Sequence, residues 1–313
     1  SGVRTSVEMN ARPIFHEPWW LDAVVGSGAW GECVVQRGEE QFARLPFVQK
    51  KKYGFTVITQ PPLSQYLGPW FKGISGQKSA KRLAREKDLT GELIKQLPKH
   101  DFFLQNFSPE ITNWLPWYWN GYKQTTRYTY RLSDFSNLDR TWDEFETKIR
   151  TDIRKSQKNE VSLELDASLE DFLPLRKKTF QRQGLNATVS DRILRRLDRA
   201  CQERACRKII IAKGNDGQSH AGAYLVWNNH TVWYLMGGGD PELRRSGATS
   251  AVLWEAIKFC SEQNKIFDFE GSMHEPIERF FRAFGAQQVP FFQITKARTG
   301  WLSLVLSITG KSH

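Results

Sequence analysis

Two carboxylates stand two residues apart in the apolar segment "KIFDFEG", residues 265–271. If this segment is a strand, its period of two places Asp268 and Glu270 on one face, roughly 7 Å apart. Either carboxylate could then take a proton from an attacking ammonium, directly or through water. Partial burial would raise its pKa and make it a better base at neutral pH. We favour Glu270, which is nearer the C-terminal end of the strand; the alternative is that both carboxylates only pair with arginines.

Two further residues near this strand could take part in proton transfer. Tyr234 lies in a predicted strand over residues 230–236 and could protonate a leaving thiolate or hydroxyl, although a tyrosine in this pattern is also a common core residue. His274 follows Ser272 and precedes Glu275, two residues that could form a capping box at a helix start. A lone histidine at such a junction is more often structural or solvated, so His274 is a secondary candidate.

The segment "RRSGAT" stands between that predicted strand and a predicted helix over residues 248–263. N–H groups at a helix start have no intrahelical partner, and the helix dipole adds partial positive charge, so this junction could bind an anion. Small residues would let a phosphate approach closely. The alternative is a glycine turn with a solvated arginine pair. The candidate phosphate-binding residues are Arg244, Arg245, Ser246, Gly247, Ala248 and Thr249.

The elements that must position these residues alternate between strands and helices. Short β-branched and aromatic segments bounded by turn residues predict the strands, and apolar periodicity predicts the helices. This alternation indicates a strongly twisted mixed sheet of the α/β or α+β class. The predicted strands cover 207–213, 220–227, 230–236, 265–271 and 289–295, and the helices cover 168–183, 188–204, 248–263 and a segment that ends at Gly285.

The first half of the chain repeats the order of elements found near its end. Residues 101–130 align without gaps with residues 265–294, and both show a strand, an aromatic helix, a glycine and a second strand. Few aligned positions are identical, so chance similarity is the alternative. We predict a duplicated fold with an N-terminal domain over residues 1–140 and a C-terminal domain over residues 141–313.

The amino-acid composition indicates which classes of binding partner to expect. The 313 residues carry a net charge of +11, which favours an anionic partner such as a nucleic acid, a nucleotide, a phosphorylated substrate or an anionic lipid surface. The four cysteines and six histidines show no metal-binding spacing, so we expect no metal. No apolar segment is long enough to span a bilayer, and no signal core is visible, so we expect a cytoplasmic protein.

The pattern R-x-x-G-x-G/A in "RRSGAT" resembles the acyl-CoA pyrophosphate loop of the GNAT acyltransferase superfamily, with Thr249 as a departure at its last position. The segments "RPIFHEPWWLDAV", "PPLSQYLGPW", "TRYTYRL", "RTDIRKSQKNEV" and "FDFEGSMHEPIERFFRAFGA" further resemble the Fem-type branch, which is related to the methicillin-resistance factors of the cell wall. The resemblance implies tandem GNAT-like domains, each a twisted mixed sheet flanked by helices. It also implies amide formation from an acyl donor and an amine acceptor, with the donor's pantetheine arm between two splayed strands and the oxyanion held by N–H groups of residues 232–236.

The resemblance also implies an acceptor site. Fem-type enzymes place basic residues of both domains around the diphosphate of a nucleotide-linked peptidoglycan precursor. Two helical stripes of basic residues fit this role, and Tyr66 and Arg282 are further candidate contacts; solvated helix faces are the alternative to the stripes. The stripes are Lys78, Arg82 and Arg85, and Arg150, Arg154 and Lys158.

Two departures leave the donor open. The tRNA-dependent Fem enzymes carry F-K-x-x-F-G, whose lysine contributes to aminoacyl transfer, whereas "FFRAFG" here has Phe281 at that position and Arg282 beside it. Those enzymes also carry a coiled-coil arm for tRNA, and this sequence shows no long charged heptad insertion. We therefore favour acyl-CoA as the donor. Aminoacyl-tRNA is the first alternative, and a non-catalytic anion-binding protein is the second.

Overall fold

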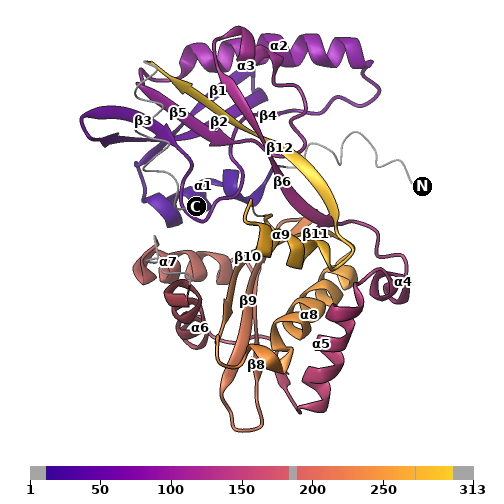
Figure 1. The fold of residues 1–313 in the computed structure, drawn as a ribbon. Helices are drawn as coiled ribbons and strands as arrows, with labels where there is room; N and C mark the ends of the chain where they lie inside the picture. The colour runs from indigo at the N-terminus through magenta and orange to yellow at the C-terminus, as the bar shows by residue number, and fades with distance from the viewer. Residues whose placement is uncertain (1–11, 183–188, 272, 299–313) are drawn as a thin grey trace. The chain divides into compact units, whose positions relative to one another are not determined.

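The computed structural model describes residues 12–182, 189–271 and 273–298. Figure 1 shows the helices and strands of the chain. They form two compact units: unit 1 comprises residues 1–127 and 290–313, and unit 2 comprises residues 128–289. In the described part of the chain, we find no helix with the length and hydropathy needed to cross a bilayer.

Unit 1 is built on strands in the order β1-β2-β3-β5-β12, with β4 paired to β2. Leu89 and Leu93 of helix α2 are buried in its core, as are Phe103 of β5 and Trp117 of α3, whose rings stack 5.7 Å apart. The elements are α1 (Pro18–Val25), β1 (Trp30–Arg37), β2 (Glu40–Lys52), β3 (Phe55–Thr59), β4 (Trp70–Phe71), α2 (Ser79–Gln96), β5 (Phe102–Asn106), α3 (Leu115–Trp119) and β12 (Gln287–Ala297).

Unit 2 contains strands in the order β6-β11-β10-β9-β8-β7. All pairs in this series for which the register is given are antiparallel except β10 with β11, so the sheet is mixed, as predicted. The elements are β6 (Lys123–Leu132), α4 (Leu138–Asp143), α5 (Thr147–Lys158), β7 (Ser162–Glu164), α6 (Leu169–Arg182), α7 (Asp191–Gln202), β8 (Arg207–Lys213), β9 (Ser219–Trp227), β10 (Thr231–Gly239), α8 (Ala248–Glu262), β11 (Ile266–Asp268) and α9 (Glu275–Arg282).

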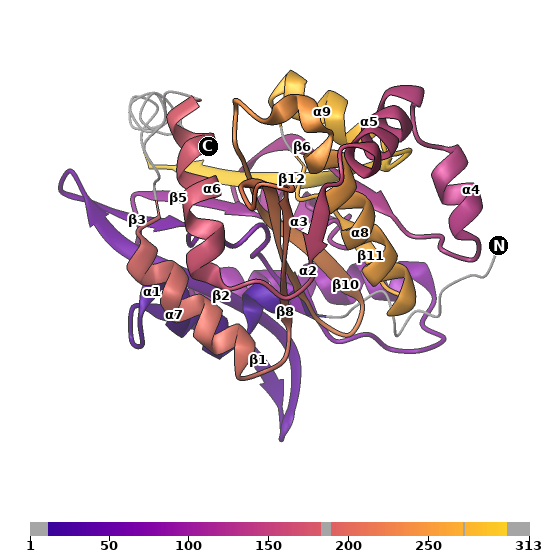
Figure 2. The same cartoon turned by 90° about the horizontal axis from the view of Figure 1, so that it is seen from below.

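Helices cover both faces of the unit 2 sheet. Figures 1 and 2 show α5 and α8 on one face and α6 and α7 on the other. Strand β9 follows the alternation that two covered faces require. Ala223 and Leu225 pack in the same core cluster as α8, whereas Tyr224 contacts Phe172 of α6 with ring centroids 6.2 Å apart. The sheet is therefore buried on both sides, and the site residues must lie at its ends.

The element boundaries match the duplication predicted from the sequence. Strand β5, helix α3 and strand β6 correspond to β11, α9 and β12, and Gly121 and Gly285 both follow their helices with left-handed φ angles of 79° and 70°. The final strand of each half pairs with the first strand of the other half: β12 is antiparallel to β5, and β6 is antiparallel to β11.

Because the two halves exchange their final strands, the compact units do not divide at residue 140, where the sequence predicted the domain boundary. The compact units divide after Arg127 and after Val289, because Gln293–Ala297 of β12 pair with β5 and so complete unit 1. Such pairing between residues far apart in sequence has no local signal.

Strands β10 and β11 differ in length from the predicted ones. β10 continues beyond the predicted end at residue 236 through Gly237, Gly238 and Gly239, and its ladder with β9 includes all three. Helix α6 explains Gly238, since a Cβ there would lie 2.8 Å from the backbone nitrogen of Arg176. Conversely, β11 ends at Asp268, three residues before the predicted end.

Candidate active site

The parallel strands β10 and β11 separate from each other at one level of the sheet. Their last paired residues are Trp233 and Asp268, yet β10 continues to Gly239. A register shift in the β9 ladder leaves Leu235 of β10 without a paired residue. Glu270 lies two residues beyond Asp268, as Leu235 lies two residues beyond Trp233, so both stand at the level where the strands separate. This is the splayed arrangement that the family resemblance implies.

Asp268 is a fully partnered structural carboxylate. Its side chain is fully buried, and Oδ1 accepts hydrogen bonds from the Thr129 hydroxyl at 2.5 Å and from the Glu270 N–H at 2.8 Å. Oδ2 accepts from Nε of Arg131 at 2.8 Å, and the Arg131 side chain is only 11% exposed. Structural hydrogen bonds thus occupy both oxygens of this carboxylate. The sequence signalled neither Thr129 nor Arg131 as its partner.

Glu270 is in the opposite situation. Its Oε1 is buried and has no hydrogen-bond partner among the described residues. Burial, with a further contribution from the charge on Asp268, raises the pKa of Glu270 well above its ordinary value. A desolvated carboxylate of raised pKa is suited to general-base chemistry near neutral pH. The two adjacent carboxylates thus have different environments.

The prediction that Asp268 and Glu270 share a strand face was wrong. Glu270 lies beyond the end of β11 with a left-handed φ of 59°, because its N–H turns back to the Asp268 carboxylate. Gly271 follows with φ of 43°, and a Cβ there would lie 2.2 Å from the carbonyl oxygen of Tyr128 in β6. The close passage of β6 therefore requires glycine and holds the bend that carries Glu270.

The predicted phosphate loop begins after β10 and ends in helix α8. Arg244–Ser246 form a short 3-10 helix, and Gly247 caps α8 with a left-handed φ of 80°. Ser246 Oγ accepts from the Ala248 N–H at 3.3 Å, while the N–H groups of the following first-turn residues have no intrahelical acceptor. No acidic residue lies in this first turn. The helix start is therefore suited to an anion.

Side chains around the loop leave it accessible on one side. Arg244, Arg245 and Thr249 are exposed, whereas Gly247 is buried against α5. A Cβ on Gly247 would lie 2.0 Å from the backbone oxygen of Asp152 in α5. The motif glycine therefore serves two purposes: it adopts the left-handed cap and lets α5 pack closely behind the loop.

Tyr234 packs against the aromatic helix that follows the site. Its ring meets Phe281 of α9 edge-on, with centroids 6.0 Å apart, and Phe281 in turn lies 5.1 Å from Phe269. Burial raises the pKa of Tyr234, so its hydroxyl holds its proton too tightly to be an efficient acid for a thiolate. The contacts support the packing interpretation of Tyr234. They also show that Phe281 occupies the family's lysine position as a core residue.

His274 and Arg282 lie at the two ends of α9. His274 is exposed, and its carbonyl oxygen accepts from the N–H groups of Ile277 and Glu278. Arg282 is directed to the helix surface, where Nε donates to Glu278 Oε1 at 3.0 Å. These contacts account for both residues structurally and support no substrate role. The capping box proposed for Ser272 lies outside the described residues.

The basic stripes lie on helices as predicted. On α5, Arg150 donates to the Asp143 carbonyl at 3.1 Å, Arg154 lies 5.6 Å from the Trp142 ring centre, and Lys158 is exposed. The other stripe begins at Lys78, immediately before α2. In α2, Arg82 pairs with Glu86 at 2.9 Å. Two buried nitrogens of Arg85 have no hydrogen-bond partner among the residues that the structure describes.

Tyr66 does not lie at an accessible surface. It is fully buried in unit 1, where its ring contacts Phe15 and Phe291 at centroid distances of 6.3 Å and 5.2 Å. The predicted loop around it is thus part of the core, and this burial gives no support to a contact with the acceptor.

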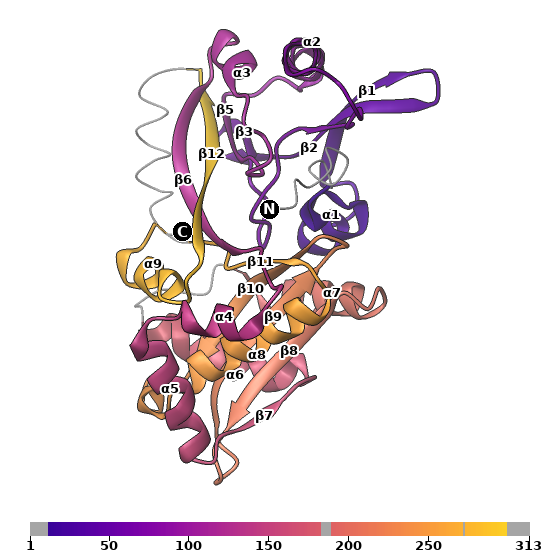
Figure 3. The ribbon, with the colours of Figure 1, turned by 90° about the vertical axis from the view of Figure 1, so that its right-hand side faces the viewer.

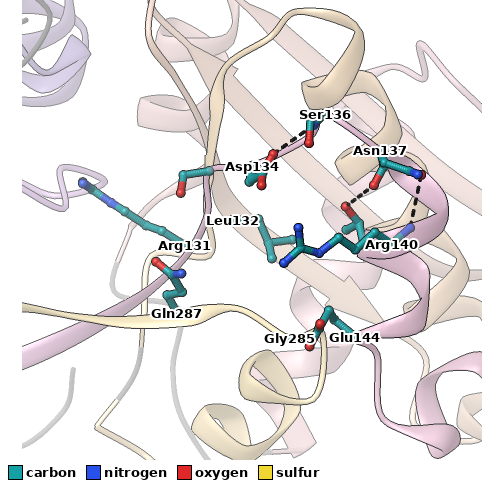
Figure 4. Close-up of a pocket in the computed structure, with 11 residues that line it drawn as sticks. Arg131, Leu132, Asp134, Ser136, Asn137, Arg140, Glu144, Gly285 and Gln287 are labelled. Atoms are coloured by element: carbon teal, nitrogen blue, oxygen red, sulfur yellow. Dashed lines mark hydrogen bonds between the residues drawn. The ribbon is translucent and has the colours of Figure 1, made fainter. Parts of the chain in front are cut away.

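A cavity of about 380 Å³ lies in unit 2 beside the end of β6 and helix α4, away from the predicted loop. Figure 4 shows Arg140 directed into it, with Asp134 and Gln287 nearby, whereas the guanidinium of Arg131 extends away. The described lining residues include none of the residues predicted from the sequence. They carry charges of both signs and do not specify a ligand.

Comparisons with known proteins agree with this geometry. The acetyltransferase (GNAT) domain family matches residues 143–276, which include the loop, α8 and the Asp268–Glu270 bend. The crystal structure of FemX is similar over 92% of this chain and 94% of its own, with a TM-score of 0.67 and 16% identity. The C-terminal domain of a putative lysylphosphatidylglycerol synthetase from Agrobacterium fabrum is similar over 92% and 90%, with a TM-score of 0.56 and 10% identity.

A tandem GNAT protein from the clavulanic acid biosynthesis pathway is similar over 90% of this chain and 94% of its own, with a TM-score of 0.51 and 11% identity. No curated protein matches the sequence. At these identities the structural likenesses establish the fold, and they confirm the predicted tandem GNAT-like architecture. Residues 143–276 thus form a GNAT acetyltransferase domain, the chain has the fold of the Fem-type branch of that superfamily, and it is an acyltransferase.

Proposed function

We propose that the protein transfers an acyl group from a CoA thioester to an amine and that Glu270 is the general base. The observation that carries this proposal is the buried Oε1 of Glu270, which lies at the level where β10 and β11 separate and has no hydrogen-bond partner in the described part of the chain. In the proposed step, Glu270 takes a proton from the acceptor ammonium, and the free amine attacks the acyl carbonyl. The C–N bond forms and the C–S bond breaks. The amine nitrogen loses a proton, the sulfur gains one, and CoA leaves as a thiol.

The oxyanion of the tetrahedral intermediate needs a hydrogen-bond donor at the same level. The N–H of Leu235 fits this role, because the bulge in β10 removes Leu235 from the ladder with β9 and pairing with β11 has already ended. A fixed backbone donor costs no reorganisation during the reaction. Leu235 lies within the 232–236 segment to which the family resemblance assigns this role.

The loop at the start of α8 is proposed to bind the donor's phosphates. Gly247 and Thr249 supply backbone N–H groups, and Arg244 and Arg245 supply positive charge that pairs with no acidic residue among the described ones. Phe281 in place of the lysine of the tRNA-dependent enzymes weighs against aminoacyl-tRNA.

The acceptor is proposed to be an amine on an anionic precursor, such as a nucleotide-linked peptidoglycan peptide, in the cytoplasm. The charge of +11 and the exposed basic stripe of α5 support an anionic acceptor. The sequence resemblance to the Fem-type branch implies a cell-wall precursor as the acceptor.

Two measurements test the donor assignment. Calorimetry of the full chain with CoA should give a dissociation constant below about 1 mM, in the usual range for enzyme substrates. Thiol release from acetyl-CoA should then depend on an added amine, and mass spectrometry should show that amine 42 Da heavier (roughly one acetyl group, on the general chemistry of amide formation). Failure to bind CoA together with retention of charged tRNA would overturn the CoA assignment in favour of the Fem-like donor.

A further inference from the structure

Helix α3 of unit 1 turns large apolar side chains outward. Leu115, Tyr118 and Trp119 are 48%, 58% and 59% exposed, whereas Pro116 and Trp117 are buried. Residues at i, i+3 and i+4 lie on one helical face, so the three exposed side chains are neighbours. Core packing explains the inward pair but gives no reason for three bulky apolar residues on the outer face.

We call Leu115, Tyr118 and Trp119 the aromatic patch. Helix α2 packs against α3, and Figures 1 and 3 show the two helices next to each other. A further apolar side chain of α2, Leu83, is 40% exposed.

Lysines lie on the segments next to the aromatic patch, and Glu86 and Asp88 flank Lys87. Residues 41–85 contain nine lysines and arginines and no acidic residue, and residues 111–133 contain three and none. Lys87 is exposed one turn after Leu83, and Lys123 is exposed four residues after Trp119. Lys296 of β12 reaches the C-terminal end of α3, where Nζ donates to the Asn120 carbonyl at 2.8 Å.

We propose that the aromatic patch docks unit 1 onto an anionic lipid bilayer. Tryptophan and tyrosine prefer the membrane–water interface, leucines gain by insertion among acyl chains, and lysines around them pair with anionic headgroups. The proposal does not rest on the proposed acyl transfer. Self-association through this surface would bring like charges together, and leucines contribute nothing to binding bases or phosphates of a nucleic acid.

Vesicle flotation with the full chain tests this assignment. The protein should float with vesicles of phosphatidylcholine and phosphatidylglycerol and not with phosphatidylcholine alone, and binding should fall with added salt. The double substitution Tyr118→Ser/Trp119→Ser should weaken binding at least about tenfold, since it removes two inserted aromatic side chains. Lys87→Gln and Lys123→Gln should each weaken it about fivefold.

A matched control is available in the same unit. Tyr53 is 72% exposed and follows three lysines in the β2–β3 hairpin, but it stands alone among the exposed apolar side chains of that turn. Tyr53→Ser should leave vesicle binding within about twofold. Circular dichroism and urea unfolding should show that all variants are folded, because the altered side chains are exposed.

Four results would overturn the proposal. They are equal binding to neutral and anionic vesicles, no vesicle binding at all, an equal loss of binding from Tyr53→Ser, and a patch-dependent dimer or RNA complex without vesicle binding. The first two results would exclude a specific interaction with anionic lipid, and the third would exclude the aromatic patch as its location. The fourth would assign the surface to a different partner.

Discussion

Replacing Glu270 with glutamine separates its chemical role from its structural one. Glutamine keeps the shape of the side chain but cannot accept a proton. A positioned general base contributes about 100- to 10,000-fold to rate, so we expect kcat/KM with acetyl-CoA and a reactive amine to fall by that factor. CoA affinity should be unchanged, because the loop at Arg244–Thr249 is untouched.

The structure also predicts how this substitution changes the pH dependence. Burial raises the folded-state pKa of Glu270 above its ordinary value. The folded protein therefore retains this proton after the unfolded chain has lost it, so the contribution of Glu270 to stability falls as pH rises through the folded pKa. Glu270→Gln should remove this fall in the free energy of unfolding, measured by urea titration at several pH values. The wild-type rate should rise with pH through the same pKa.

Asp268→Asn is the matched control because it alters the neighbouring carboxylate. It leaves the buried Arg131 guanidinium without its charged partner, so the free energy of unfolding should fall by about 3–5 kcal/mol. The variant that remains folded should keep most of its rate at saturating substrate. The reasoning would be refuted if Glu270→Gln retained full activity, or if Asp268→Asn lost as much rate per folded molecule as Glu270→Gln.

Three further predictions concern the loop and its supports. Gly247→Ala should destabilise unit 2 by more than about 2 kcal/mol and weaken CoA binding. The control Gly217→Ala should cost about 1 kcal/mol, because Gly217 has nearly the same φ but open space around its Cβ position. Urea unfolding compares the two variants, and equal costs would contradict the contact of Gly247 with α5. Arg244→Gln/Arg245→Gln should weaken CoA binding about tenfold with a reduced salt dependence in calorimetry, and Lys258→Gln at the other end of α8 should not. Gly238→Ala should lower the free energy of unfolding by about 1–3 kcal/mol because α6 lies against it, and an unchanged urea midpoint would count against that packing.

The loop and the strand–helix order were predictable because their signals are local. Small residues after "RR" and an apolar run mark the start of α8, and the structure begins that helix at Ala248 as predicted. The aligned halves share strand, helix and glycine positions, so Gly121 and Gly285 could be matched before the fold was known. Helix propensity, periodicity and turn chemistry act over a few residues and are readable from sequence.

The roles of the two carboxylates were not predictable in the same way. Periodicity placed Asp268 and Glu270 as equivalents on one face. Only the tertiary structure brings Thr129 and Arg131 of β6 to Asp268 and leaves Glu270 Oε1 buried with no hydrogen-bond partner among the described residues. A pKa depends on desolvation and on charges from distant segments, and neither is encoded in the spacing of two residues.

By itself, the sequence determined the order of the elements, the duplication and the position of the strand–loop–helix junction at residues 244–249, since each depends on residues close together in the chain. The tertiary structure decided which carboxylate is held by hydrogen bonds from β6, that β12 completes unit 1, and that Tyr66 is a core residue. These outcomes depend on contacts between residues that are far apart in the sequence. Asp268, for example, is 139 residues from Thr129 and 137 residues from Arg131, its two partners in β6. Long-range packing sets burial and hydrogen-bond partners, and these in turn set the chemistry of each side chain.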